Sequence, residues 1–130
     1  MNVKIDTKEK FTVITVKEPD ISANMTDHLA EMMLHYLSKE IPHLVLNMTH
    51  VSHIDDAVAE MIAGIQQQFY EKNASFIVCG LQINVENVFE RLEFLDTMNI
   101  TPTESEAWDI VQMEEIEREI MGDFDKNTEQ

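Results

Sequence analysis

The strongest constraint on the fold is an alternation of short apolar runs with longer amphipathic segments. Two runs, Leu44–Leu46 and Phe76–Val78, carry no charged residue and have the character of buried strands. Between them, residues 55–72 repeat apolar side chains at helical spacing, with Ile62 and Ile65 on the same face. Strand–helix–strand units of this kind connect parallel strands. The pattern therefore predicts an α/β domain with a mostly parallel sheet.

The chain before this unit predicts a hairpin and one further helix. Residues 2–6 alternate apolar and polar side chains, and residues 11–16 are rich in β-branched and aromatic types, as strands are. The polar residues between them suit a tight hairpin connection. A helical pattern follows over residues 24–41, where Asn24 is placed to cap the first turn and Pro42 stops the helix.

The chain after the unit predicts two further helices with a short strand between them. Asn84 precedes apolar side chains at helical spacing and is expected to cap that helix. Residues 98–100 are expected to form an edge strand, and residues 103–106 fit a capping box that starts the last helix. The connections are short and no internal repeat is present. We therefore assign a single domain to residues 1–112.

Residues 113–130 form an acidic C-terminal extension that differs from the rest of the chain. Beyond Met113 there are seven acidic and two basic side chains. Four apolar side chains follow one another at spacings of three and four, as on one face of a helix: Met113, Ile116, Ile120 and Phe124. Two interpretations remain. Either the last helix continues with an apolar stripe that binds a partner, or the end is solvated and frays near Gly122.

The charge of the chain narrows the classes of partner. Among 130 residues, nine are Lys or Arg and 25 are Asp or Glu, which gives a formal net charge of −16 at pH 7. Nucleic acids and anionic membranes are bound through clustered basic residues, so neither is expected as a partner. A basic or charge-patterned protein surface is favoured instead. No targeting or membrane-spanning segment is recognisable, and we expect a cytoplasmic protein without direct membrane insertion.

The residue types needed for catalysis are not brought together by any motif. The single cysteine, Cys79, lies in an apolar strand run, where a thiol is usually buried and inert. His50 and His53 are close in sequence, but no second pair or cysteine cluster completes a metal site. The three glycines are far apart and form no phosphate-binding loop. We therefore expect no catalytic residue, no metal, no cofactor and no enzyme activity.

The segment from the first buried run into the following helix carries a resemblance to a known family. Residues 45–49 read Val-Leu-Asn-Met-Thr, and residues 51–59 read Val-Ser-His-Ile-Asp-Asp-Ala-Val-Ala. The segment resembles the STAS domain, a module shared by sulfate transporters and antagonists of anti-sigma factors. The family pattern is apolar-apolar-Asp-Leu-Ser, a turn, and Ile-Asp-Ser-Ser-Gly-Leu. The resemblance covers roughly residues 2–112 and implies a small sheet with an N-terminal hairpin and helices mainly on one face.

The departures from the family pattern fall on its regulatory residues. In the family, the second serine of Asp-Ser-Ser-Gly is phosphorylated by a partner kinase that is also an anti-sigma factor. The matching residue here is Ala57, which has no hydroxyl group. Asp56 replaces the first serine, Val58 the glycine, and Asn47 the aspartate at the strand end. Two interpretations follow. Asp56 imitates a phosphorylated state, or the switch is lost and the surface binds its partner without regulation by phosphorylation, here called fixed binding. We favour the second.

We expect a non-catalytic protein-interaction module, in the regulatory setting that the resemblance implies. The predicted contact surface is the loop and the start of the helix, where acidic side chains face a basic or amide-rich partner. Asp55 is expected to cap this helix, which leaves Asp56 freer to face the partner. The predicted partner-binding residues are Ser52, His53, Asp55, Asp56, Ala57, Val58 and Glu60.

Two classes of protein partner agree with this interpretation. One is an anti-sigma factor or kinase-like protein, which would make the chain similar to an anti-sigma factor antagonist. The other is a subunit of a membrane-transport complex, to which the chain would attach as a soluble accessory subunit. Homo-oligomers are also compatible with the sequence. A small-molecule or nucleotide binder is disfavoured because the chain lacks a phosphate loop.

Overall fold

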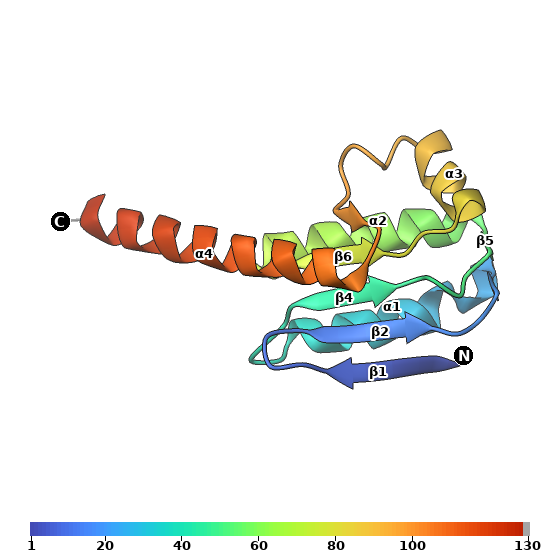
Figure 1. Cartoon of the computed structure of the whole chain (residues 1–130), viewed down its shortest axis with the longest axis horizontal. Helices are drawn as coiled ribbons and strands as arrows, with labels where there is room; N and C mark the ends of the chain where they lie inside the picture. The colour runs from blue at the N-terminus through green and yellow to red at the C-terminus, as the bar shows by residue number, and fades with distance from the viewer. Residues whose placement is uncertain (129–130) are drawn as a thin grey trace.

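A five-stranded sheet forms the centre of the protein in the computed structural model, which describes residues 1–128 and their side chains as far as Gly122 (Figure 1). The strand order is β1-β2-β4-β6-β7. β1 and β2 are antiparallel, whereas every other neighbouring pair is parallel. The strands are β1 (Val3–Thr7), β2 (Thr12–Val16), β4 (Leu44–Asn47), β6 (Phe76–Cys79) and β7 (Ile100–Thr101). The predicted hairpin and mostly parallel sheet are confirmed.

The helices follow the predicted order, but two of their starting points differ from the prediction, and the first helix ends at Leu37 before Pro42 can stop it. They are the 3₁₀ turn η1 (Ala23–Met25) and the α-helices α1 (Thr26–Leu37), α2 (Asp56–Glu71), α3 (Ile83–Arg91) and α4 (Glu104–Thr128). Asn24 does not cap α1, because it lies inside η1 and its side chain meets the Ser22 hydroxyl. Asn84 does not cap α3 either: the extended residue before the helix is Gln82.

A second, two-stranded sheet was not predicted. Its strands, β3 (Asp20–Ile21) and β5 (His53–Ile54), are parallel and have two residues each. Runs this short carry no recognisable alternation, so their sequence pattern cannot identify them as strands. Ile21 and Ile54 are buried and anchor this small sheet to the core. The pairing ties the loop before α2 to the chain that leads into α1.

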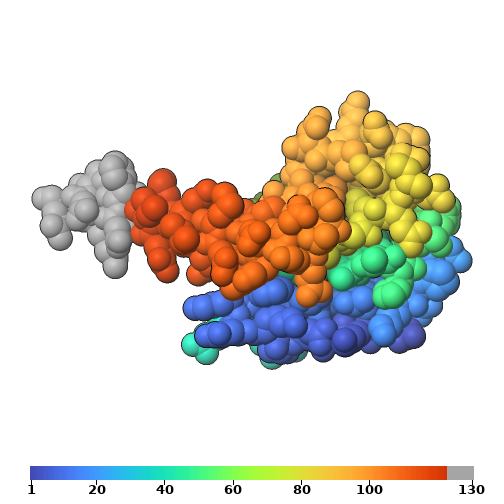
Figure 2. Space-filling view, viewed as in Figure 1, coloured from blue at the N-terminus to red at the C-terminus, as the bar shows by residue number. Residues whose placement is uncertain are grey.

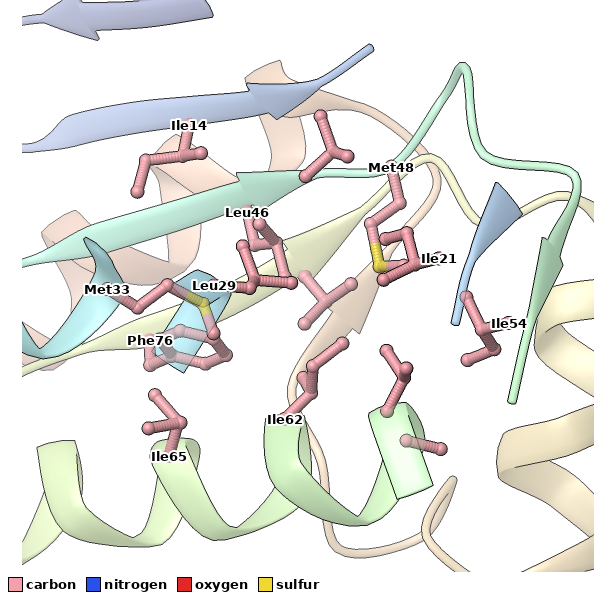
Figure 3. Packing of buried hydrophobic residues seen from close by; sticks show 14 of the residues in the cluster. Ile14, Ile21, Leu29, Met33, Leu46, Met48, Ile54, Ile62, Ile65 and Phe76 are labelled. Atoms are coloured by element: carbon pink, nitrogen blue, oxygen red, sulfur yellow. The ribbon is translucent and has the colours of Figure 1, made fainter. Parts of the chain in front are cut away.

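The larger part of the core lies between the sheet and helices α1 and α2 (Figure 3). Ile62 and Ile65 point from α2 toward the sheet and are 0% and 2% exposed, as predicted. They meet side chains of the strands, among them Leu46 and Phe76. Leu44 and the two residues after it are completely buried, as expected for a central strand. Helices therefore cover mainly this face of the sheet.

Helix α4 covers part of the opposite face and then continues beyond the sheet (Figures 1 and 2). Its first turns pack a smaller cluster of buried residues: Phe11, Val13, Val45, Ile77, Cys79, Ala107 and Val111. The predicted cap at its start is present, because the Glu106 backbone N–H donates to the Thr103 hydroxyl at 3.2 Å. In the part of the chain that the structure describes, no helix combines the length and the apolar character needed to cross a bilayer.

Candidate interaction site

The loop after β4 is held by hydrogen bonds from both sides. The Asn47 side-chain oxygen accepts a bond from the Thr49 backbone N–H at 3.0 Å, so Asn47 closes the turn in place of an aspartate. Gln82 donates to the Thr49 carbonyl at 2.8 Å. Gly80 has φ +75°, and a Cβ there would lie 2.8 Å from the Thr49 hydroxyl oxygen. Glycine is therefore required where the loops after β4 and β6 approach each other.

The next part of the loop is held by the residues around β3. The Pro19 carbonyl accepts a bond from the Ser52 backbone N–H at 2.7 Å and from the Ser52 hydroxyl at 3.0 Å. This contact uses the Ser52 hydroxyl in a structural role. Together with the β3–β5 pairing, it orients the chain that enters α2.

Asp55 connects the starts of two helices, which corrects the prediction that its side chain caps α2. Asp55 does occupy the position before the first helical residue, but its carboxylate makes no capping bond there. Instead, the carboxylate accepts a hydrogen bond from the Ala23 backbone N–H at 2.7 Å, at the start of η1. Asp55, at the start of α2, thus accepts a bond from a backbone N–H at the start of η1 that has no partner within its own helical turn.

Asp56 is paired rather than free, which corrects the second expectation for this site. Its two carboxylate oxygens accept bonds from the two terminal nitrogens of Arg91 in α3, with Nη1 at 3.1 Å from Oδ2. Both side chains are about half exposed. The hydrogen bond from Arg91 lowers the pKa of Asp56 below its ordinary value of 3.8, so the carboxylate stays ionised to a lower pH than an unpaired one would. Arg91 is a site residue that sequence reasoning missed, because it lies 35 residues away with no local signal.

The first turn of α2 presents a small surface to solvent. His53, Ala57 and Glu60 are exposed, and Ser52 is half-buried. Val58 was predicted to contact a partner, but it is completely buried and packs beneath the first turn of α2 instead. We call the exposed surface formed by His53, Asp56, Ala57 and Glu60 the α2 surface.

Two groups that could support chemistry, Cys79 and His43, are buried. Burial raises the pKa of the Cys79 thiol to about 12, which keeps it protonated and unreactive. His43 accepts a bond from the Ser75 backbone N–H at 3.0 Å and contacts Glu115 at 2.5 Å. Within the residues that the structure describes, no group of three or more potential ligands is placed to hold a metal ion.

The sequence matches the STAS domain family over residues 2–107, which is most of the chain. The chain belongs to the STAS domain family. This agrees with the element order, the antiparallel β1–β2 pair and the helix that opens at Asp56. Membership supports a regulatory interaction module.

Solved structures show the same STAS fold at low sequence identity. An anti-sigma factor antagonist from Mycobacterium paratuberculosis is 14% identical with a TM-score of 0.75, over 85% of this chain and 93% of that chain. The anti-sigma factor antagonist SpoIIAA in its unphosphorylated form is 15% identical with a TM-score of 0.69, over 85% and 96%. The murine anion transporter Slc26a9 is 14% identical with a TM-score of 0.67, over 80% of this chain but only 18% of that one.

Proposed function

We propose that this STAS domain is a non-catalytic regulatory module, similar to anti-sigma factor antagonists, which binds a protein partner through the α2 surface. The observation that carries the proposal is the placement of Ala57. By the resemblance to the family pattern, this residue matches the position of the phosphoserine, and it is exposed in the first turn of α2. Its methyl group cannot accept a phosphate, so the surface would bind its partner without the usual serine switch.

The hydrogen bonds around the α2 surface support fixed binding. Ser52 and Asp55 are tied to the chain around β3, and Asp56 is tied to α3. A surface held in this way loses little conformational entropy when a partner binds, because its loop is already ordered. The partner would meet a preformed shape in which Ala57 is the small central residue.

The pairing of Asp56 argues against permanent imitation of a phosphoserine. A phosphate group carries between one and two negative charges and three acceptor oxygens near neutral pH. Asp56 carries one charge, and both of its oxygens already accept bonds from Arg91. The local charge is therefore largely compensated before any partner arrives. Fixed binding accounts for this arrangement better than a constitutive phosphorylated state.

A second candidate function is an accessory subunit of a membrane-transport complex. It is favoured by the likeness of this fold to the part of the murine anion transporter Slc26a9 that it matches. In this case the same module would attach to a separate membrane protein. Recovery of a transporter with the full chain would support this alternative, whereas recovery of a kinase-like regulator would support the first.

The proposal can be tested by placing a large side chain at its centre. Full-length protein and the variants Ala57→Arg and Gln68→Arg are immobilised, and the proteins that they capture from the native cell are quantified by mass spectrometry. Gln68 is an exposed residue further along α2 and serves as the matched control. We expect one partner to be retained by Gln68→Arg and lost by Ala57→Arg, with at least a tenfold weaker Kd once purified. Equal binding by Ala57→Arg would overturn the assignment of the surface.

A kinase experiment separates fixed binding from a modified switch. Incubation of the wild type with serine kinases that act on STAS domains should leave residues 49–60 without phosphate. Mass spectrometry of Ala57→Ser under the same conditions shows whether the surrounding loop still fits a kinase. Stoichiometric phosphate on Thr49 or Ser52 of the wild type would contradict fixed binding.

A further inference from the structure

The part of α4 beyond the sheet exposes an apolar stripe. Met113, Ile116 and Ile120 follow at spacings of three and four and are 58%, 56% and 62% exposed. We call these three residues the outer stripe. Large apolar side chains grouped on one exposed helical face mark an interaction surface more often than scattered single residues do. The outer stripe does not pack on the sheet, so its apolar side chains are not explained by the core of this domain.

The outer stripe faces away from the domain because the other side of α4 is anchored. Glu114 accepts a hydrogen bond from the Tyr70 hydroxyl at 2.8 Å. Glu115 contacts His43, and Arg118 donates to the Ser75 hydroxyl at 2.9 Å. These polar contacts continue the line of Val111, which is completely buried against the sheet. Since the helix cannot rotate without breaking them, the outer stripe stays directed to solvent.

A hollow in the surface adjoins the outer stripe. It has a volume of about 530 Å³ and lies between α4 and the turn that joins β1 to β2. Trp108, Gln112 and Ile116 line it from α4, and Lys10 lines it from the turn. The Trp108 ring stacks on Phe11 at 4.9 Å between centroids, which fixes this wall of the hollow. A side chain from a partner that lies along α4 could enter this hollow.

The charges beside the outer stripe select the kind of partner. Glu117 and Glu119 are exposed and flank Ile116 and Ile120 along the helix. In an antiparallel pair of identical helices, e positions face e positions and g positions face g positions, so these carboxylates would face one another across the seam and repel. A helix with Lys or Arg at the same flanking positions would instead pair with them while its apolar residues cover the outer stripe.

We propose that α4 binds a basic amphipathic helix of another protein through the outer stripe. This site is independent of the α2 surface, because the start of α2 and the far part of α4 lie at opposite ends of the molecule (Figure 1). Figure 2 shows α4 extending from the body of the protein. One chain could then contact two partners at once.

The test uses two synthetic amphipathic peptides and the full-length protein. Both peptides carry Leu and Ile at heptad a and d positions, one with Lys at the flanking e and g positions and the other with Glu. Binding is measured by fluorescence anisotropy at low and high salt. The protein variants are Ile116→Gln/Ile120→Gln, the charge reversal Glu117→Lys/Glu119→Lys, and the control Ile83→Gln, which removes an isoleucine that is 67% exposed on α3.

We expect the Lys peptide to bind at least tenfold more tightly than the Glu peptide, with the difference reduced at high salt. The Ile116→Gln/Ile120→Gln variant should lose at least tenfold in affinity, the charge reversal should favour the Glu peptide, and Ile83→Gln should bind as the wild type does.

Equal binding of the two peptides, or unchanged binding by the double isoleucine variant, would overturn the proposal. A wild-type dimer that the double variant abolishes would assign the outer stripe to a second copy and also overturn it. None of these variants alters the α2 surface, so the two proposals fail separately.

Discussion

The two faces of the sheet are covered in different ways. On one face, α1 and α2 enclose a large core to which strands, loops and helices all contribute. On the other, α4 contributes to a cluster of seven buried residues among those that the structure describes, and it is held further along by polar contacts to His43, Tyr70 and Ser75. The first face therefore carries most of the hydrophobic stabilisation, which is roughly proportional to the apolar area buried. The second face holds one helix in a defined orientation.

This difference has a consequence for function. Helices α1 and α2 direct their apolar sides into the core, so their outer surfaces are polar, as at the α2 surface. Helix α4 uses apolar contacts in its first turns and polar anchors in the next. Its apolar residues beyond Val111 are consequently left on the outside. The face with the weaker cover is the one that presents an apolar docking surface.

The largest expected effect comes from a change in the larger core. Ile62→Ala should lower the free energy of unfolding by about 2–5 kcal/mol, because it leaves a cavity at a completely buried position. Urea denaturation followed by circular dichroism measures the change. Ile116→Ala is the matched control and should stay within about 0.5 kcal/mol, since Ile116 is exposed. Similar losses for both variants would mean that the burial of α2 has been assigned wrongly.

A smaller effect is expected on the face that α4 covers. Val111→Ala should lower the free energy of unfolding by about 1–3 kcal/mol, because two buried carbon atoms are removed from a small cluster. The same denaturation experiment checks this, and Met113→Ala, on the exposed side of the same helix, is the control. A loss larger than that of Ile62→Ala would reverse the proposed ranking of the two faces.

The next effect concerns the link between the starts of η1 and α2. Asp55→Ala should lower the free energy of unfolding by about 1 kcal/mol, through loss of the hydrogen bond from the Ala23 backbone N–H. Asp55→Asn should lose less, because its side-chain oxygen can still accept this bond. Denaturation midpoints of both variants give the comparison, with the exposed Glu60→Ala as control. Equal losses for alanine and asparagine would show that charge, and not the bond, is what matters.

The smallest expected effect is a pH dependence that arises where α4 is anchored. Burial lowers the pKa of His43 below its ordinary value of 6.5, and the positive charge of Arg118 also lowers it, against the opposing influence of Glu115 and Glu114. Since the unfolded chain then binds the proton more readily, stability is complete above pH 6.5 and decreases as the pH falls below it. Protonation of Nδ1 would also remove the acceptor for the Ser75 N–H.

Thermal or urea midpoints between pH 7.5 and 5.5 test this dependence. The wild type should lose more stability on acidification than His43→Asn, in which the titrating group is absent. His53→Asn removes an exposed histidine and should follow the wild type. If His53→Asn and His43→Asn reduce the pH dependence of stability equally, this dependence does not arise at the site around His43 where α4 is anchored.

Much of the fold could be predicted from local patterns in the sequence. The apolar runs at Leu44 and Phe76 predicted central strands, and the helical spacing of Ile62 and Ile65 predicted the buried face of α2. Both predictions depend on periodicity within a single element, which directly reflects which side of that element meets the core. The cap at Thr103 was predicted for a similar reason, because its partner Glu106 is only three residues away.

The contacts that define the α2 surface could not be predicted in the same way. Asp55 bonds to Ala23 across 32 residues, and Asp56 pairs with Arg91 across 35. A carboxylate at a helix start has several equally good local roles, and only the packing of η1 and α3 beside α2 selects among them. The two-residue strands β3 and β5 depend likewise on each other and carry no pattern alone.

Helix α4 shows which features the sequence alone determines and which features depend on the tertiary structure. Its sequence determined that Met113, Ile116 and Ile120 share one helical face, because a spacing of three and four residues places side chains together on any α-helix. Whether that face meets the sheet or the solvent was decided only by the tertiary structure. Val111 and the polar contacts of Glu115 and Arg118 set the rotation of the helix, since their partners on β2, β4, β6 and the adjoining loops occupy one side of it.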